Sequence, residues 1–286
     1  MISDSGPGPG LDVRTARRAG ELVVGTYLAS LREAKRISRG DAAASAGISW
    51  LELRRLEAGA PGLEAATATA LLRTYGITAM ADVRAVTRLL RPPPYDDVRL
   101  DDAPGHQQRL AACEHTARST RTWAPIWLPT PVQTPDYAAC HARWALPQEE
   151  YGPATLGMRH LTEKGPRTTL LLDEQLLTRA GPGVEVMARQ LGHLRDLMER
   201  RLISVRVLPL DSGVITLSSP LTELRLPRAR LFVSETYGVL YAGDSAQHRF
   251  RLDVIEAAAV SPRQSYDWLG RVQRRFTTRA GASTKA

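Results

Sequence analysis

Apolar residues recur every three or four positions through the first third of the chain, the spacing typical of amphipathic helices. In the run ELVVGTYLASLREAKR, Val24, Leu28 and Leu31 share one face. Four shorter periodic runs follow, at residues 39–47, 49–59, 62–77 and 78–90. The pattern therefore predicts five short helices in one all-α domain that covers residues 22–91.

The helical pattern stops at RPPPYDDVRLDDAPG, where three prolines cannot continue a helix and the remaining residues are mostly polar. Helical and strand patterns then alternate in the rest of the chain. We expect helices at residues 106–123, 134–146, 183–201, 245–260 and 261–276. We expect strands at residues 168–174, 203–210, 221–227, 230–235 and 238–244, the first two forming a strand–helix–strand unit.

Together these elements predict an α+β protein with two domains. The expected second domain, residues 106–276, is a mixed α/β domain with a small sheet. We expect a mobile arm at 1–21, a linker at 92–105 and a disordered tail at 277–286, because these segments lack an apolar period.

The stretch Ser38–Gly62 carries the features of a helix-turn-helix. Gly47 stands where a tight turn is needed, and the small Ala43 stands where two helices would cross. Ser49 is suited to cap the second helix, and with Glu52 three residues later it forms a capping box. The expected inner face is apolar, with Ile48, Leu53 and Leu56. In such motifs the first turn of the second helix touches base edges in the major groove.

The run LREAKRISRGDAAASAGISWLELRRLEAGAPGLEAATATALLRTYGI is similar to the Xre-type (Cro/repressor-like) helix-turn-helix regulators. The segments APIWLPTPVQTPDYA, TTLLLDEQLL, ISVRVLPLDSG and VLYAGDSAQHRFRLDVIEAAAVSP resemble the C-terminal antitoxin-like domain of an actinobacterial subfamily of these regulators. The resemblance covers residues 22–270. It implies binding to double-stranded DNA, transcription regulation and a small partner protein encoded nearby.

The DNA-facing residues depart from the family, which has small or amide side chains at positions 50–52 and leucines at the positions of Ala42 and Ala46. On the motif, the expected DNA-binding residues are Arg39, Ser49, Trp50, Leu51, Arg54 and Arg55. In one interpretation the arginines hold phosphates while Trp50 and Leu51 contact thymine methyl groups. In the other, the helix-turn-helix is a scaffold that no longer reads DNA, and Trp50 or Leu51 folds back to fill the space beside the alanines.

Aromatic residues gather in two parts of the second domain, around Trp123–Trp144 and around Tyr237–Tyr241. They predict an apolar ligand pocket lined by Trp123, Trp127, Gln133, Tyr137, Tyr237 and Tyr241. A regulator would sense a small molecule there. An alternative is a regulator-like protein repurposed as an enzyme, for example a cyclase of specialised metabolism, with Glu223, Glu235, His193 and Tyr237 as its catalytic groups. A third hypothesis is an antitoxin-like module that mainly binds protein.

The chain has 286 residues and a net charge of +8, and its pI of about 9.9 favours an acidic partner such as nucleic acid. Nearly all basic residues are arginines, which also fits the coding bias of a high-GC bacterium. No apolar run approaches the roughly 18 residues of a membrane span, and the first residues lack a signal peptide. We therefore expect a cytoplasmic protein without a membrane partner.

Two cysteines, Cys113 and Cys140, each stand near a histidine, but the spacing supplies no set of metal ligands. We expect free thiols, no metal and no cofactor. The chain also lacks a nucleophile elbow and a phosphate-binding glycine loop, which argues against an enzyme. We expect a homodimer, with the contact supplied by an apolar face of the closing helix that carries Trp268, Leu269, Val272 and Phe276.

Overall fold

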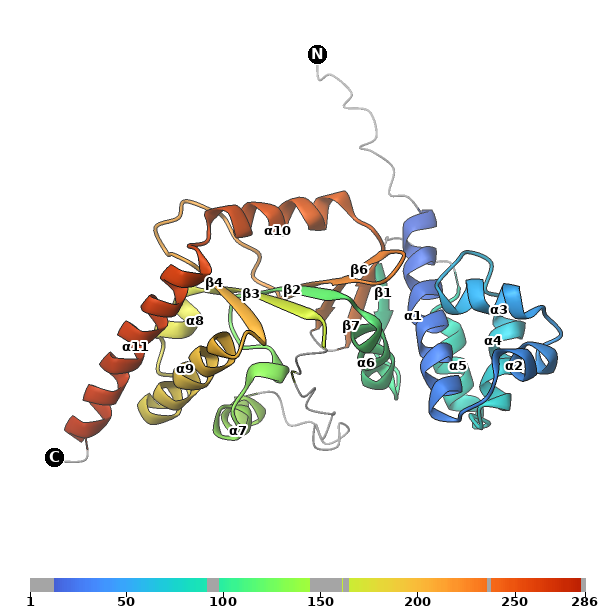
Figure 1. Ribbon diagram of the computed structural model, residues 1–286, viewed down its shortest axis with the longest axis horizontal. Helices are drawn as coiled ribbons and strands as arrows, with labels where there is room; N and C mark the ends of the chain where they lie inside the picture. The colour runs from blue at the N-terminus through green and yellow to red at the C-terminus, as the bar shows by residue number, and fades with distance from the viewer. Residues whose placement is uncertain (1–12, 92–97, 145–160, 162–164, 236–237, 284–286) are drawn as a thin grey trace, which may run out of the picture. The chain divides into compact units, whose positions relative to one another are not determined.

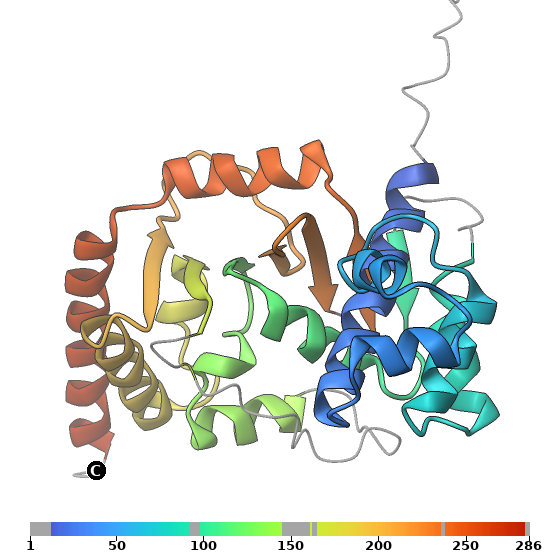
Figure 2. The same ribbon diagram turned by 45° about the vertical axis from the view of Figure 1, so that its right-hand side comes forward.

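The computed structural model describes residues 13–91, 98–144, 161, 165–235 and 238–283 (Figures 1 and 2). The helices are α1 (Val13–Ala34), α2 (Arg39–Ser45), α3 (Trp50–Glu57), α4 (Ala65–Thr74), α5 (Met80–Arg88), α6 (His106–Thr116), α7 (Pro135–Trp144), α8 (Glu174–Thr178), α9 (Val184–Glu199), α10 (Ala246–Ala258) and α11 (Pro262–Ser283), with a 3-10 turn at Thr130–Val132. The strands are β1 (Val98–Asp101), β2 (Ser119–Ala124), β3 (Arg167–Asp173), β4 (Ile203–Leu208), β5 (Leu221–Arg225), β6 (Arg230–Glu235) and β7 (Val239–Ala242).

The strands form one mixed sheet in the order β1-β7-β6-β5-β2-β3-β4. An α+β fold is thereby confirmed, although with seven strands the sheet is larger than the small one expected. Contacts divide the chain into two compact units. Unit 1 comprises Met1–Ala117 and Leu224–Ser245, and unit 2 comprises Arg118–Glu223 and Ala246–Ala286.

In unit 1, helices α1–α5 share a single hydrophobic core with α6 and with the strands β6 and β7. Helix α1 runs between α2–α5 on one side and α6 and β1 on the other (Figure 1), and it contacts both α3 and α6. Strand β7 pairs antiparallel with β1 and with β6. The helices that resemble a DNA-binding module are therefore not packed around a core of their own.

In unit 2, the strands β2, β3 and β4 are parallel neighbours. Alternate side chains of these strands, such as Leu170 and Leu172, pack in one core with α9 and α11. The opposite face carries Arg121 and Trp123 of β2, and α10 lies on this side of the sheet (Figure 1). The predicted strand–helix–strand unit is confirmed as β3, α9 and β4.

Two strands were missed in the sequence. The predicted linker at 92–105 contains β1, a short strand with only two apolar residues. The aspartates on either side of it are typical of a loop. The predicted helix at 106–123 ends at Thr116, and STRTWA continues as β2. The β-branched and aromatic residues of that segment favour a strand, and pairing with β3 outweighs its weak helical pattern.

Helix ends also differ from the expectation. Helix α1 begins at Val13 rather than near Leu22, and Ala19, Gly20 and Glu21 of the predicted arm are buried. Gly20 is not a helix breaker here: a Cβ at this position would lie 2.0 Å from the carbonyl oxygen of Leu89, so glycine allows α1 to approach the end of α5. Residues 1–12 of that arm lie outside the described residues.

The predicted disordered tail at 277–286 was wrong as far as Ser283, because α11 continues to that residue. The hydroxyl groups of Thr277 and Thr278 donate to the carbonyl oxygens of Gln273 and Arg274 one turn earlier, as threonines within helices do. Within the described ranges, no helix has both the length and the apolar character that crossing a bilayer requires.

Candidate nucleic-acid interface

Helices α2 and α3 are joined by a tight turn, and both begin at a serine cap. The Ser38 hydroxyl accepts from the amide of Asp41 at 3.1 Å, and the Ser49 hydroxyl accepts from the amide of Glu52 at 3.2 Å. Gly47 has a φ of +68°, although an added Cβ there would meet nothing within 4 Å. Glycine is thus needed at this turn for its backbone conformation and not for space.

The inner side of helix α3 is stabilised by apolar packing and by a buried carboxylate. Leu53 and Leu56 are buried, and Glu57 at the end of the helix accepts from Arg32 of α1 at 3.1 Å and from Arg39 of α2 at 2.9 Å. The hydrogen bond to Glu57 raises the pKa of the Arg32 guanidinium. One carboxylate therefore connects three helices, a contact that sequence reasoning did not predict.

This arrangement gives Arg39 a contact that the sequence did not suggest. Arg39 was expected to hold a DNA phosphate, yet its Nε donates to Glu57 while about half of its side chain stays exposed. A phosphate contact by Arg39 would therefore use its remaining guanidinium N–H groups.

The outer face of α3 combines apolar and basic side chains in solvent. Trp50 is 56% exposed and Leu51 is 51% exposed, and Arg54 and Arg55 are exposed one turn further along. In the described part of the chain, neither arginine side chain has a hydrogen bond or ion pair. Trp50 and Leu51 do not fold back into the core, although Ala42 is completely buried there.

The residues predicted to line a ligand pocket are distributed over both units. In unit 2, Trp127 and Tyr137 contact each other edge to face, with ring centroids 6.4 Å apart. Gln133 donates its side-chain amide to the carbonyl oxygen of Leu128 at 2.6 Å, and the Tyr137 hydroxyl accepts from the amide of the same leucine at 3.4 Å. These polar groups hold the backbone after β2.

Of the other three predicted pocket residues, two are described, and both are buried in core positions. Trp123 is completely buried in unit 2, and its indole N–H donates to the carbonyl oxygen of Leu217 at 2.9 Å. Tyr241 is buried in the core of unit 1, where burial raises its pKa well above the ordinary value. Tyr237 lies outside the described residues. Within unit 2, only Trp127, Gln133 and Tyr137 thus form a local group.

The three described acid–base groups proposed for an enzyme lie on different elements. Glu223 of β5 is fully buried and forms an ion pair with Arg121 of β2 at 2.8 Å. His193 is half-buried on α9, and Glu235 is exposed at the end of β6 in unit 1. The carboxylate of Glu223 is thus engaged by the guanidinium of Arg121 in the interior of unit 2.

Arg121 is the centre of a larger ion-pair cluster, which sequence reasoning missed. Its guanidinium contacts Asp253 at 2.6 Å and Glu256 at 2.8 Å, both on α10, and Arg206 of β4 lies 3.9 Å from Glu256. Burial alone lowers the pKa of Arg121, but the hydrogen bonds to Glu256 and Asp253 outweigh it and raise the pKa. The cluster fastens α10 to the sheet. Only the spacing of Asp253 and Glu256 on one helix face was visible in the sequence.

The cysteines and the closing helix occupy ordinary packing positions. Cys113 is buried in the core of unit 1, and Cys140 donates to the carbonyl oxygen of Pro182 at 3.6 Å. Leu269, Val272 and Phe276 are buried in the core of unit 2. Trp268, the fourth residue expected at a dimer contact, is partly buried against the same core, so this face of α11 packs within its own unit.

Comparison with known proteins relates most of the second part of the chain to a described family. A family model described as a domain of unknown function, DUF5753, matches residues 107–271. No curated protein matches the chain, and no solved structure does. The match begins in α6, whose residues share the core of α1–α5, and it ends within α11. The family model covers more than half of the chain, so the chain belongs to the DUF5753 family.

Proposed function

We propose that this protein is a DNA-binding transcriptional regulator. In this proposal residues 22–91 are an Xre-type helix-turn-helix domain, and α3 is the helix that enters the major groove. The DUF5753 domain senses a small molecule or a partner protein encoded nearby. The protein acts in the cytoplasm and binds its operator as a homodimer.

The exposed outer face of α3 carries this proposal. Trp50 and Leu51 are more than half exposed in the first turn, which is the part of such a helix that touches base edges. Large apolar side chains in water gain nothing for folding, so their exposure is better explained by a partner than by packing. Their chemistry suits contact with thymine methyl groups, while Arg54 and Arg55 suit phosphates.

The shared core of unit 1 supports a sensing role for the DUF5753 domain. Helix α1 contacts α3 on one side and α6 on the other, and α6 lies within the matched family domain. A ligand or partner with different affinities for two alternative placements of α6 would favour one of them. Because both helices contact α1, such a ligand would also favour one placement of α3.

An electrophoretic mobility shift at low salt tests the proposal, with the DNA upstream of the protein's own gene as probe. We expect a shift that weakens steeply as salt rises, because phosphate contacts release counterions. The double variant Arg54→Ala/Arg55→Ala should reduce the slope of log affinity against log salt by roughly two. The matched control is Arg73→Ala/Arg84→Ala, which removes two exposed arginines from α4 and α5.

The control should leave the affinity for the upstream DNA close to that of the unaltered protein. Absence of a shift with the unaltered protein would reject the proposal. Equal losses in the two double variants would show that charge alone, and not the face of α3, determines binding.

A further inference from the structure

Helix α11 carries a row of arginines on the side away from its buried face. Leu269, Val272 and Phe276 pack into the core of unit 2. The exposed surface of the helix carries Arg271, Arg274, Arg275 and Arg279, which we call the α11 arginine stripe. These residues line an open hollow together with Thr278. Asp267 is the only acidic residue between Pro262 and Ser283.

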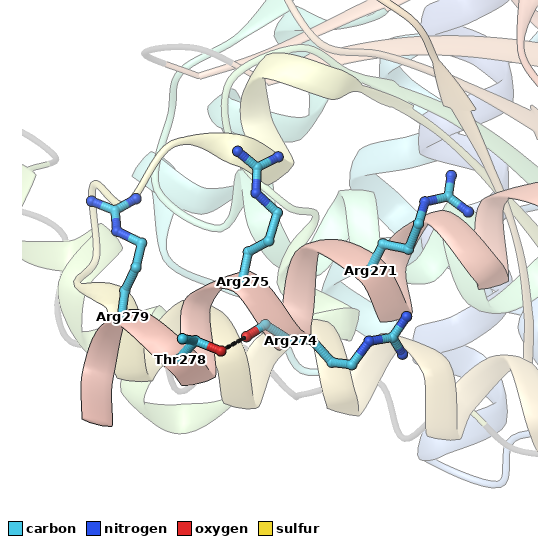
Figure 3. Close-up of a pocket in the computed structure, with 5 residues that line it drawn as sticks. All are labelled: Arg271, Arg274, Arg275, Thr278 and Arg279. Atoms are coloured by element: carbon cyan, nitrogen blue, oxygen red, sulfur yellow. Dashed lines mark hydrogen bonds between the residues drawn. The ribbon is translucent and has the colours of Figure 1, made fainter. Parts of the chain in front are cut away.

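The stripe has the spacing of a continuous charged row. Arg271, Arg275 and Arg279 follow one another at intervals of four residues, and their side chains leave the helix on the same side, while Arg274 points elsewhere (Figure 3). Eight residues of helix extend about 12 Å. One strand of B-DNA carries roughly three or four phosphates over that distance.

Three of these charges have no compensating partner in the described part of the chain. Among the residues that the structure describes, the side chains of Arg271, Arg274 and Arg275 make no hydrogen bond or ion pair. Like charges four residues apart on a helix repel each other. Some other arginines of the same unit are partnered: Arg189 pairs with Asp136 at 2.7 Å, and Arg195 donates to the hydroxyl of Tyr266 at 2.7 Å. The stripe is therefore the kind of surface that an anionic partner stabilises.

The chemistry of the helix favours a phosphate polymer over a membrane. A helix that binds a lipid surface inserts an apolar face between the headgroups, but the apolar face of α11 is already buried in unit 2. The residues beside the stripe, Thr277 and Thr278, are exposed and small. Guanidinium groups bind phosphate oxygens with two parallel hydrogen bonds.

We propose that the α11 arginine stripe binds the phosphate backbone of duplex DNA, as a contact that is independent of base sequence and separate from α3. The identity of the polymer rests on the proposed function, whereas the chemistry of the site rests on α11 alone. The contact adds affinity and salt dependence without adding preference for one sequence.

Fluorescence anisotropy with a labelled duplex of random sequence tests this inference on the full chain. In the triple variant Arg271→Ala/Arg274→Ala/Arg275→Ala, the slope of log affinity against log salt should fall by roughly two to three, and affinity at low salt should fall at least tenfold. The matched control Arg200→Ala/Arg251→Ala/Arg263→Ala removes three exposed arginines of unit 2 outside the stripe. It should have a much smaller effect. The triple lysine variant of the stripe should retain the slope, and circular dichroism checks that all variants are folded.

The outcomes separate this inference from the proposed function. The variant Trp50→Ala/Leu51→Ala should lose its preference for the upstream DNA over random duplex, because it lacks the side chains assigned to base contacts. Its affinity for random duplex, to which the stripe contributes, should stay close to that of the unaltered protein. A stripe variant that binds random duplex as tightly as its control would overturn the inference and leave the role of α3 untouched. Binding of the unaltered protein to phosphatidylserine vesicles but not to random duplex would also overturn it, by assigning the stripe to a lipid surface.

Discussion

Helices α3 and α11 present two arginine-bearing faces that are built in different ways. Each buries an apolar stripe, with Leu53 and Leu56 in α3 and with Leu269, Val272 and Phe276 in α11. Helix α3 is additionally held by the buried carboxylate of Glu57. Towards solvent, α3 shows Trp50 and Leu51 beside its arginines, whereas the outer face of α11 shows arginines and threonines.

This difference indicates two kinds of contact with the same polymer. Arginine alone recognises phosphate, which every DNA sequence carries in the same way. Exposed apolar groups can distinguish bases, since the thymine methyl group is an apolar feature of the major groove. On this argument α3 is the surface that selects a sequence, and α11 is a surface that only adds attraction.

The largest expected effect is on the ion pairs behind α3. The change Glu57→Gln removes the buried charged partner of Arg32 and leaves it only the exposed carboxylate of Glu33, so we expect the free energy of unfolding to fall by about 3–5 kcal/mol. Urea denaturation followed by circular dichroism measures it. The control Glu52→Gln, at an exposed position of the same helix, should change stability by less than about 0.5 kcal/mol. Equal stability of the two variants would mean that the buried pair does not hold α3.

Helix α11 should instead depend on an apolar side chain. Phe276 is 2% exposed, and Phe276→Ala removes most of its packing, so we expect a loss of about 3–4 kcal/mol by the same denaturation assay. The neighbouring Thr277→Ala should change stability by less than about 0.5 kcal/mol, because Thr277 is exposed and bonds only to its own helix. A small effect of Phe276→Ala would contradict the burial of this face within unit 2.

The turn before α3 should respond more moderately. Gly47 has a positive φ of 68°, and alanine is strained there by about 1–2 kcal/mol. Thermal unfolding of Gly47→Ala should show this loss. Gly40→Ala provides the matched control, since Gly40 lies inside α2 with space for a Cβ, and alanine there should be neutral or stabilising by up to about 1 kcal/mol. Equal melting temperatures of the two variants would argue against a conformational need at Gly47.

Periodic patterns predicted the long elements of this fold well. The five N-terminal helices, α9 to α11 and the strands β3 to β7 all lie where apolar spacing predicted them. Local chemistry also identified the serine caps of α2 and α3 and the turn at Gly47. Such features depend on neighbouring residues alone, so one sequence is enough to find them.

The remaining features depend on contacts between distant residues. Strand β2 is stabilised by pairing with β3, about 48 residues further along, and nothing within STRTWA reveals that partner. Arg121 and Glu223 are similarly remote in the sequence. The arginine stripe, in contrast, was visible as RVQRRFTTR, but its importance depends on the other face of α11 being buried. A pattern of charge alone does not say which side of a helix faces solvent.

The smallest expected effect on stability, and the sharpest test of the comparison, is Trp50→Ala. Because Trp50 is 56% exposed, its removal should change the free energy of unfolding by less than about 0.5 kcal/mol. The affinity of this variant for the upstream DNA should fall roughly tenfold or more, as expected for a lost base contact. Its affinity for random duplex should stay close to that of the unaltered protein.

The triple alanine variant of the α11 arginine stripe should instead lower the affinity for both DNAs by similar factors. Competition between the two labelled duplexes, measured with both variants at one salt concentration, compares these patterns directly. If Trp50→Ala weakened both DNAs equally, the apolar side chains of α3 would add only attraction, and α3 would not differ in kind from α11.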